Sequence, residues 1–473
     1  MNSAAKVTHR ASPLGAQPRA GCMGAARAAC AGGVRFGRFP HGHRLAAWIA
    51  SVGLFLFLAA PEAGAQRFAE YELPPTLYSK TEADNGITRL QERIDSGELK
   101  LIGTLEEETL RRCLAALGVS PDTQVLVFSK TSLQRNRIHP TTPRALFFSD
   151  DIYVGWVPGG MLEIAATDPQ LGLVFYRLDL RRSSRPPRFH RDNDCLSCHA
   201  GPHTRRWPAL MIRSVFPDAS GEPIGRAGSF LTDHTSPLAE RWGGWYVTGQ
   251  HGDARHMGNA IAREDGHEVR LDREAGANIN RLDAWFPVGR YPRPDSDIVA
   301  LMVLEHQVTM HNLLAEGALR VRRWLHYQQA LQQELGETVT TEPTGTALRV
   351  VEGETRRILD GLLFHNEAPL PEGGVSGHPE FPVAFRANRR ADIHGRSLKD
   401  LDLSTRLFTY RCSYLIHSEA FTGLPAPLKT SVYRALHAGL HDSEPVAPFD
   451  HLSPDERVAI REILTATLPE WLR

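Results

Sequence analysis

The stretch Ala145-Leu-Phe-Phe-Ser-Asp-Asp-Ile-Tyr-Val-Gly-Trp-Val157 places two short apolar runs on either side of a polar turn. Aromatic and β-branched runs separated by Ser and Asp are typical of paired antiparallel strands. Similar runs lie at 124–128, 161–165 and 173–176. Turn residues at 158–160 and 168–169 separate the run that ends at Val157 from those at 161–165 and 173–176. Their spacing of roughly 8–12 residues predicts an antiparallel sheet.

Segments with helical periodicity lie on both sides of this predicted sheet. Apolar residues recur every three or four positions over 87–99 and 105–117, and again over 296–335 and 343–363. Two more helices are expected near the end, the last beginning at the capping-box sequence Ser453-Pro-Asp-Glu456. The pattern predicts an α+β fold with N-terminal helices and antiparallel strands, a loop region in the middle of the chain and a helix-rich C-terminal half.

Between the sheet and the C-terminal helices lies Cys195-Leu-Ser-Cys-His199, a C-x-x-C-H sequence. This is the attachment signal for a c-type haem. The two thiols can each form a thioether with one vinyl group, and the following histidine can supply the proximal nitrogen to the iron. A zinc site would need a further Cys or His pair at ligand spacing, and no second C-x-x-C exists. The motif predicts one covalent haem c on Cys195 and Cys198, with His199 as proximal iron ligand.

The start of the chain resembles an export signal, as haem c attachment requires. The first 44 residues hold seven Lys/Arg and no Asp or Glu, and an apolar run follows from Leu45 to Ala60. Ala63-Gly64-Ala65 matches a signal-peptidase site. The run is shorter than the roughly 20 residues that a spanning helix needs. We expect residues 1–65 to be a signal peptide, with Met23 as an alternative start. The protein is then periplasmic or otherwise exported, with no stable membrane span after cleavage.

After this segment the chain carries 47 basic and 53 acidic residues, so its net charge is negative. Nucleic acid is not expected as a partner, because phosphate binding needs a basic face. The remaining length exceeds that of a small electron carrier. We expect an N-terminal α/β region at 66–182, a haem-binding region at 183–295 and a helical region at 296–473. Cys113 and Cys412 are left either as a disulfide or as two buried thiols.

Several side chains are candidates for the sixth iron ligand. Met257 lies on a predicted loop, and Met/His ligation raises the haem potential. His306 and Met310 are alternatives, one turn apart on the apolar stripe of the predicted long helix. His251, His256 or an open position complete the possibilities. Each of these side chains also has an ordinary packing explanation.

Five stretches together resemble a family of bacterial exported proteins described as cytochrome c domain-containing. They are Gln124-Val-Leu-Val-Phe-Ser-Lys-Thr-Ser-Leu-Gln134, Pro143-Arg-Ala-Leu-Phe-Phe-Ser-Asp-Asp-Ile-Tyr-Val-Gly-Trp-Val157, Cys195-Leu-Ser-Cys-His199, Gly243-Gly-Trp-Tyr-Val-Thr-Gly-Gln-His-Gly252 with its continuation Arg255-His-Met-Gly-Asn259, and Glu305-His-Gln-Val-Thr-Met-His-Asn312. The resemblance implies haem binding and electron transfer in the cell envelope. It also implies that Cys195 and Cys198 are the covalent sites and His199 the axial ligand.

These observations favour an exported monohaem c-type cytochrome-like protein that exchanges single electrons with a redox partner protein. The alternative is a haem-dependent, peroxidase-like oxidoreductase with an open distal site. It draws on the length of the chain and on the polar cluster His251, Asp253, Arg255 and His256. A haem sensor module is a third possibility, although no output domain is visible in the sequence. Whether the protein is an enzyme is left open at this level.

Overall fold

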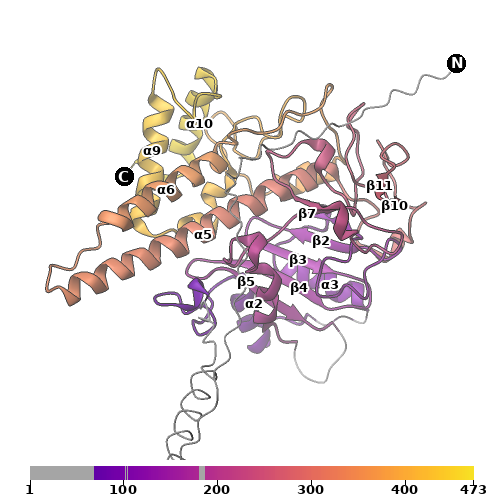
Figure 1. Cartoon of the computed structure of the whole chain (residues 1–473), viewed down its shortest axis with the longest axis horizontal. Coiled ribbons are helices and arrows are strands. Elements are labelled where there is room, and N and C mark those ends of the chain that lie inside the picture. Colours follow the sequence, from indigo (N-terminus) through magenta and orange to yellow (C-terminus); the bar gives the residue numbers. More distant parts are fainter. Residues whose placement is uncertain (1–68, 102, 104, 181–186, 473) are drawn as a thin grey trace, which may run out of the picture. The chain divides into compact units, whose positions relative to one another are not determined.

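A computed structural model describes residues 69–101, 103, 105–180 and 187–472 (Figure 1). The predicted signal peptide, residues 1–65, lies outside the described residues. The remaining chain, from Arg67 to Arg473, forms one compact unit.

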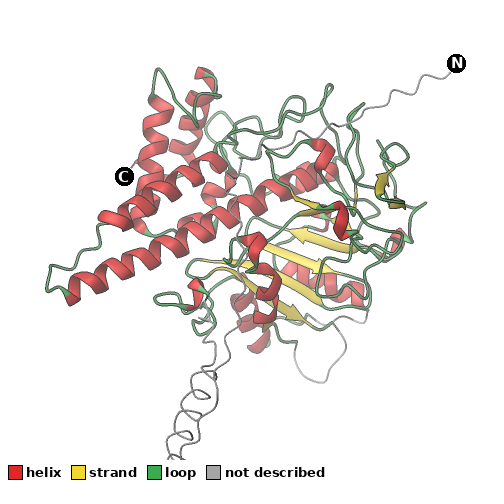
Figure 2. Ribbon diagram, in the orientation of Figure 1, coloured by secondary structure: helices red, strands yellow, loops and turns green. Residues whose placement is uncertain are grey.

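An antiparallel sheet of seven strands occupies the N-terminal part of this unit (Figure 2). The strand order is β6-β5-β4-β3-β2-β1-β9, and each strand pairs with its neighbours in antiparallel fashion. The strands are β1 Val125–Val127, β2 Arg144–Phe148, β3 Ile152–Trp156, β4 Leu162–Asp168, β5 Gly172–Leu178, β6 His190–Arg191 and β9 Trp245–Tyr246. The predicted meander is confirmed, because β2 to β5 follow one another both along the chain and across the sheet.

Two small hairpins lie outside this sheet. Strands β7 Arg213–Val215 and β8 Ser229–Leu231 form one, and β10 Ala262–Asp265 and β11 Glu268–Leu271 form the other. Apart from β9 and two short 3-10 turns, the segment that carries them is loop, so the middle of the chain is largely irregular, as expected.

Two helices cover one face of the sheet, α2 Gly86–Asp95 and α3 Glu106–Ala116. The Asn85 side chain caps α2 and also donates from Nδ2 to the Tyr176 hydroxyl of β5 at 2.9 Å. Glu106, at the start of α3, accepts a hydrogen bond from the Trp156 indole of β3 at 2.7 Å. Each helix is thus joined to the sheet at its N-terminal end.

The long helix α5, Ile298–Glu334, packs on the opposite face of the sheet. Tyr153 of β3 points to this face, and its hydroxyl is 2.7 Å from Nδ1 of His311 on α5. Gly172 in β5 allows the close approach, since a Cβ there would lie 2.8 Å from the Ala315 side chain. All α5 residues from 298 to 308 are buried, so this part of the helix is central to the core.

Three further helices extend the core from α5 into the C-terminal half (Figure 1). Helix α6, Gly345–Leu362, packs along α5; α9, Ala426–His441, packs on α6; and α10, Pro454–Thr467, packs on α9. The shorter helices are α4 Leu196–His199, α7 Glu380–Phe385 and α8 Glu419–Thr422. The predicted α+β class with a helix-rich C-terminal half is confirmed.

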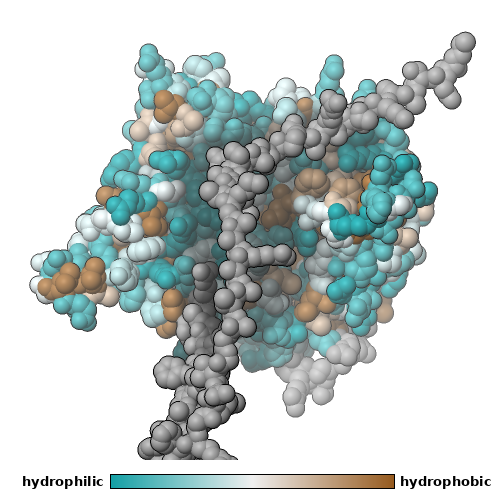
Figure 3. Space-filling view, viewed as in Figure 1, coloured by the Kyte–Doolittle hydropathy of each residue, from teal (hydrophilic) through white to brown (hydrophobic). Residues whose placement is uncertain are grey.

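Among the described helices, α5 alone is long and apolar enough to cross a membrane, and 83% of its most apolar window is buried inside the protein. Its apolar residues therefore serve the core of this fold. The C-terminal end of α5 and the residue after it expose apolar side chains instead. Tyr327, Leu331 and Leu335, at i, i+4 and i+8, are 59%, 47% and 63% exposed. Figure 3 shows apolar groups gathered at this protruding end.

One local expectation, the capping box at the start of α10, needs correction. Ser453 does cap α10, because its Oγ accepts from Glu456 N at 3.2 Å. The Glu456 carboxylate binds Arg411 instead of accepting from the Ser453 backbone, so only half of the predicted capping box forms.

Cys113 and Cys412 are both free and buried, which selects the two-thiol alternative over the disulfide. Burial raises the pKa of each thiol to about 12.

Candidate haem-attachment site

The C-x-x-C-H sequence forms one helical turn beside the β5–β6 edge of the sheet. Residues Asn193–Cys195 make a 3-10 turn that continues into α4, Leu196–His199. Side chains at i, i+3 and i+4 share one face of a helix. Cys195, Cys198 and His199 therefore project from the same side of this turn. Both thiols are free, with Cys195 half-buried and Cys198 exposed.

His199 is held in one tautomer by a backbone carbonyl. Its Nδ1 lies 2.7 Å from the oxygen of Ala209. Since a carbonyl only accepts, Nδ1 carries the proton and Nε2 keeps its lone pair. Nε2 has no hydrogen-bond partner in the described part of the chain. Burial lowers the pKa of His199, so the ring is neutral at physiological pH.

The imidazole of His199 packs on the same sheet face that α5 covers. Its ring centroid is 4.7 Å from that of Phe175 in β5. Phe175 pairs with Ala165 of β4, which pairs with Tyr153 of β3. This row across three strands places the His199 turn and the Tyr153–His311 contact on one face of the sheet.

Helix α5 also anchors the loop that accepts the His199 hydrogen bond. The Asn312 side chain accepts from Leu210 N at 2.8 Å and donates to Leu210 O at 2.9 Å. The amide thus pairs with the backbone next to Ala209 as a neighbouring strand would. Sequence reasoning missed Asn312, although it ends one of the quoted family stretches. The contact spans 102 positions, so no local pattern could reveal it.

A buried ion pair lies near His199 on this face. Arg144 of β2 reaches Glu163 of β4, with Nη2 and Oε2 2.6 Å apart. The guanidinium passes over Gly155 of β3, where any Cβ would overlap it. The remaining oxygen of Glu163 is buried and has no hydrogen-bond partner among the described residues. Both charges act on His199, the arginine lowering and the glutamate raising its pKa.

A second ion pair sits beside the first cysteine. Arg177 Nε of β5 lies 2.8 Å from Asp192 Oδ2, and the Cys195 thiol donates to the same oxygen at 3.6 Å. Burial and the Asp192 charge raise the pKa of Cys195 to about 12. The thiol is therefore protonated at neutral pH.

The three named candidates for a distal iron ligand are engaged in the core. Met257 is fully buried, and its Sδ is 3.5 Å from the Ser214 hydroxyl. His306 Nε2 is 2.8 Å from the Ser413 hydroxyl, and Met310 is buried against α6. In the described segments, none of these contacts is with residues 195–209. A distal ligand from this set stays a prediction.

The polar cluster behind the enzyme alternative is built into its own loop. The two ring nitrogens of His251 contact Ala254 O at 2.8 Å and Asn278 N at 3.0 Å. Arg255 pairs with Glu274, and Gly258 N donates to Nδ1 of His256 at 2.9 Å. Asp253 is exposed on the same loop. These contacts account for the histidines and the arginine as supports of the loop.

Comparisons of the chain with protein-family models, curated proteins and solved structures give no match. The family resemblance thus stays an expectation from sequence. No group of three or more His, Cys, Asp or Glu is placed to hold a metal ion among the described residues. A haem would need only His199 and one further group from the protein, because the porphyrin supplies the other iron ligands.

Proposed function

We propose that this protein carries one covalent haem c on Cys195 and Cys198 and exchanges single electrons with a redox partner protein outside the cytoplasm. The observation that carries the proposal is the state of His199. Its Nδ1 proton is fixed on the Ala209 carbonyl, and its Nε2 lone pair is free beside two unpaired thiols. A ligating histidine needs this arrangement, with one nitrogen anchored and the other available.

Each residue of the turn then has a defined role. The thiols of Cys195 and Cys198 would hold the haem covalently, and His199 would supply its Nε2 as an iron ligand. Haem iron supplies a one-electron redox couple when bound. The Ala209 hydrogen bond orients the imidazole and increases its basicity, which favours the oxidised iron. The buried Arg144–Glu163 pair adds fixed charges whose balance would tune the potential.

Exposure of the turn favours electron exchange over a closed catalytic pocket. Ser197 and Cys198 are both exposed, so a group bonded to Cys198 would be within reach of a partner protein. The peroxidase-like alternative gains no support from His251 and Arg255, because both are already held by their loop.

Covalent attachment is tested on the exported protein with a haem stain after denaturing electrophoresis and a pyridine haemochrome spectrum. The native chain should retain one haem per chain. The double variant Cys195→Ala with Cys198→Ala should lose it, whereas Cys113→Ala should keep it because that thiol is buried in α3. Haem retained by the double variant would refute the attachment site.

Carrier and enzyme are separated by optical spectra of both redox states, with and without cyanide or peroxide. A low-spin, six-coordinate iron that ignores both reagents supports the carrier. A high-spin iron that binds either one would favour the oxidoreductase alternative. Met257→Ala should remove the near-infrared Met–iron band if Met257 is the sixth ligand, and an unchanged spectrum eliminates it.

A further inference from the structure

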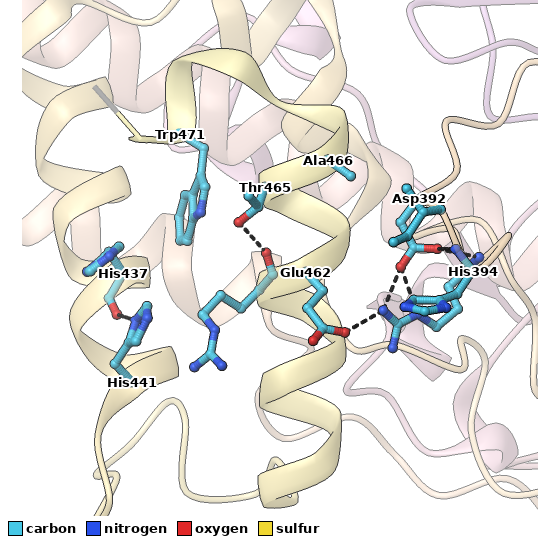
Figure 4. Close-up of a pocket in the computed structure, with 11 residues that line it drawn as sticks. Asp392, His394, His437, His441, Glu462, Thr465, Ala466 and Trp471 are labelled. Carbon is cyan, nitrogen blue, oxygen red and sulfur yellow. Dashed lines mark hydrogen bonds and ion pairs between the residues drawn. The ribbon is translucent and has the colours of Figure 1, made fainter.

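A separate cavity of about 460 Å³ lies between α9, α10 and the segment around Asp392 (Figure 4). No residue of the C-x-x-C-H turn lines it. Its volume falls within the range of roughly 300–1,000 Å³ typical of small-molecule sites. The electron-transfer role proposed above assigns nothing to this cavity.

The cavity has one cation that the protein does not neutralise. Arg396 is held by Asp392 at 2.6 Å and by Glu462 at 2.5 Å, so its charge is balanced and both carboxylates are occupied. Arg461 also lines the cavity, and its guanidinium has no ion-pair or hydrogen-bond partner among the residues described. The lining therefore presents a free guanidinium without a competing free carboxylate, which suits an anionic ligand.

An indole and imidazole rings make up much of the remaining lining, together with Ile393, Thr465 and Ala466. Trp471 is 4% exposed, and its Nε1 is buried without a hydrogen-bond partner among the described residues. Its ring lies 5.8 Å from that of His437, which stacks on His441 at 4.2 Å. Figure 4 shows the Trp471 indole between α10 and the two histidines of α9. An inorganic anion would leave the exposed rings of His437 and His441 uncovered, whereas a planar molecule would pack on them.

Exposed apolar surface at the rim points to the same kind of ligand. Ile393 lines the cavity and is 92% exposed. A ring entering the cavity would cover part of this side chain and remove apolar surface from water. We propose that the cavity binds a small aromatic carboxylate, with its carboxylate on Arg461 and its ring beside Trp471 and His437.

The test is a calorimetric titration of the full exported protein at pH 7 with benzoate, cyclohexanecarboxylate and inorganic phosphate. Benzoate should bind in a saturable manner and more tightly than either comparison compound. Arg461→Gln should weaken benzoate binding about tenfold or more, the loss expected for a charge-assisted hydrogen bond. Arg434→Gln, an exposed arginine of α9 outside the cavity, is the matched control and should bind as the native chain does.

Trp471→Phe gives an independent readout. It keeps a ring in the wall and removes the indole N–H, so benzoate should still bind while the benzoate-induced change in tryptophan fluorescence is lost. Far-ultraviolet circular dichroism checks that each variant is folded. Equal benzoate affinity in Arg461→Gln and native protein would overturn the assignment, as would phosphate binding as tightly as benzoate. Neither result depends on haem attachment, so the two proposals fail separately.

Discussion

At the scale of single residues, the candidate haem-attachment site depends on two specific contacts, a hydrogen bond to His199 and an ion pair near it. In the first contact, the Ala209 carbonyl fixes the tautomer of His199 and leaves its Nε2 lone pair available to bind a metal. The second contact is the ion pair between Arg144 and Glu163. It exists only because Gly155 leaves the space through which the guanidinium passes. A glycine in a central strand is otherwise unfavourable, so its presence in β3 is explained by this close approach.

Gly155→Ala should therefore destabilise the protein by about 1–3 kcal/mol, the cost of leaving a buried charged group without its partner. The added methyl group displaces the Arg144 guanidinium and leaves the Glu163 carboxylate without its ion-pair partner. Urea unfolding followed by circular dichroism measures the change in unfolding free energy. Gly353→Ala is the control, since nothing lies within 4 Å of a Cβ there and the position is helical. The control should be neutral or slightly stabilising, and equal effects at both positions would contradict the explanation.

At the scale of elements, helix α5 joins the two halves of the fold. It contacts the sheet through Tyr153 and His311, the loop before β7 through Asn312, and the C-terminal helices through α6. Its hydrogen bonds to the Leu210 backbone hold the segment whose neighbour, Ala209, anchors His199. The helix is thus a positioning element for the proposed haem ligand.

Asn312→Leu keeps the branching of the side chain and removes both hydrogen bonds to Leu210. The unfolding free energy should fall by about 1–3 kcal/mol, because a backbone N–H and a carbonyl lose their partners. The midpoint potential of the haem should also shift, since the Ala209 carbonyl moves relative to His199. Thr309→Ala, one turn earlier on α5, loses only a bond to its own helix and is the control. A stability loss with no change of potential would leave Asn312 a purely structural residue.

The elements that sequence predicts well are those whose signal is local. Strands β2 to β5 and helices α5 and α6 follow from periodicity, whereas the helical turn at Cys195–His199 lies where a loop was expected. What could not be predicted is pairing over long separations, such as Asn312 with Leu210 or Arg144 with Glu163 across Gly155. Glu456 shows the same limit, because tertiary pairing with Arg411 overrides the local capping box.

At the scale of the whole molecule, residues 67–473 share one core, so the three predicted regions should not fold independently. A chain of residues 66–295 would expose the sheet face that α5 covers and would lose the Asn312 anchor. We expect this fragment to be insoluble or unfolded and to lack covalent haem. In the full chain, tryptophan fluorescence and far-ultraviolet circular dichroism should report coincident urea transitions. A soluble, haem-bearing fragment or separated transitions would contradict a single cooperative unit.

The pH dependence of stability follows from two sets of groups whose pKa values burial shifts, downward for histidines and upward for carboxyl groups. Burial lowers the pKa of four histidines from the ordinary value of 6.5 to about 3 or 4; these are His234, His256, His311 and His417. Between 6.5 and those values the unfolded chain binds protons that the folded chain does not. Each histidine therefore reduces stability by about 1.4 kcal/mol per unit as the pH falls through this window.

Three buried carboxyl groups act in the opposite direction. Burial raises the pKa of Asp151 and Asp297 to about 6 and that of Glu305 to about 7. Between their ordinary values and these values the folded chain holds the extra proton, so stability rises as the pH falls. Burial also lowers the pKa of His306 well below 6.5. Between pH 6.5 and pH 6 only Glu305 offsets the histidines, whereas from about pH 6 to pH 4.5 all three carboxyl groups offset them in part. The free energy of unfolding, measured by urea titration at half-unit steps from pH 7.5 to 3.5, should therefore fall below about pH 6.5, with a smaller slope between pH 6 and pH 4.5. An equally steep slope between pH 6 and pH 4.5 would show that the carboxyl groups do not offset the buried histidines.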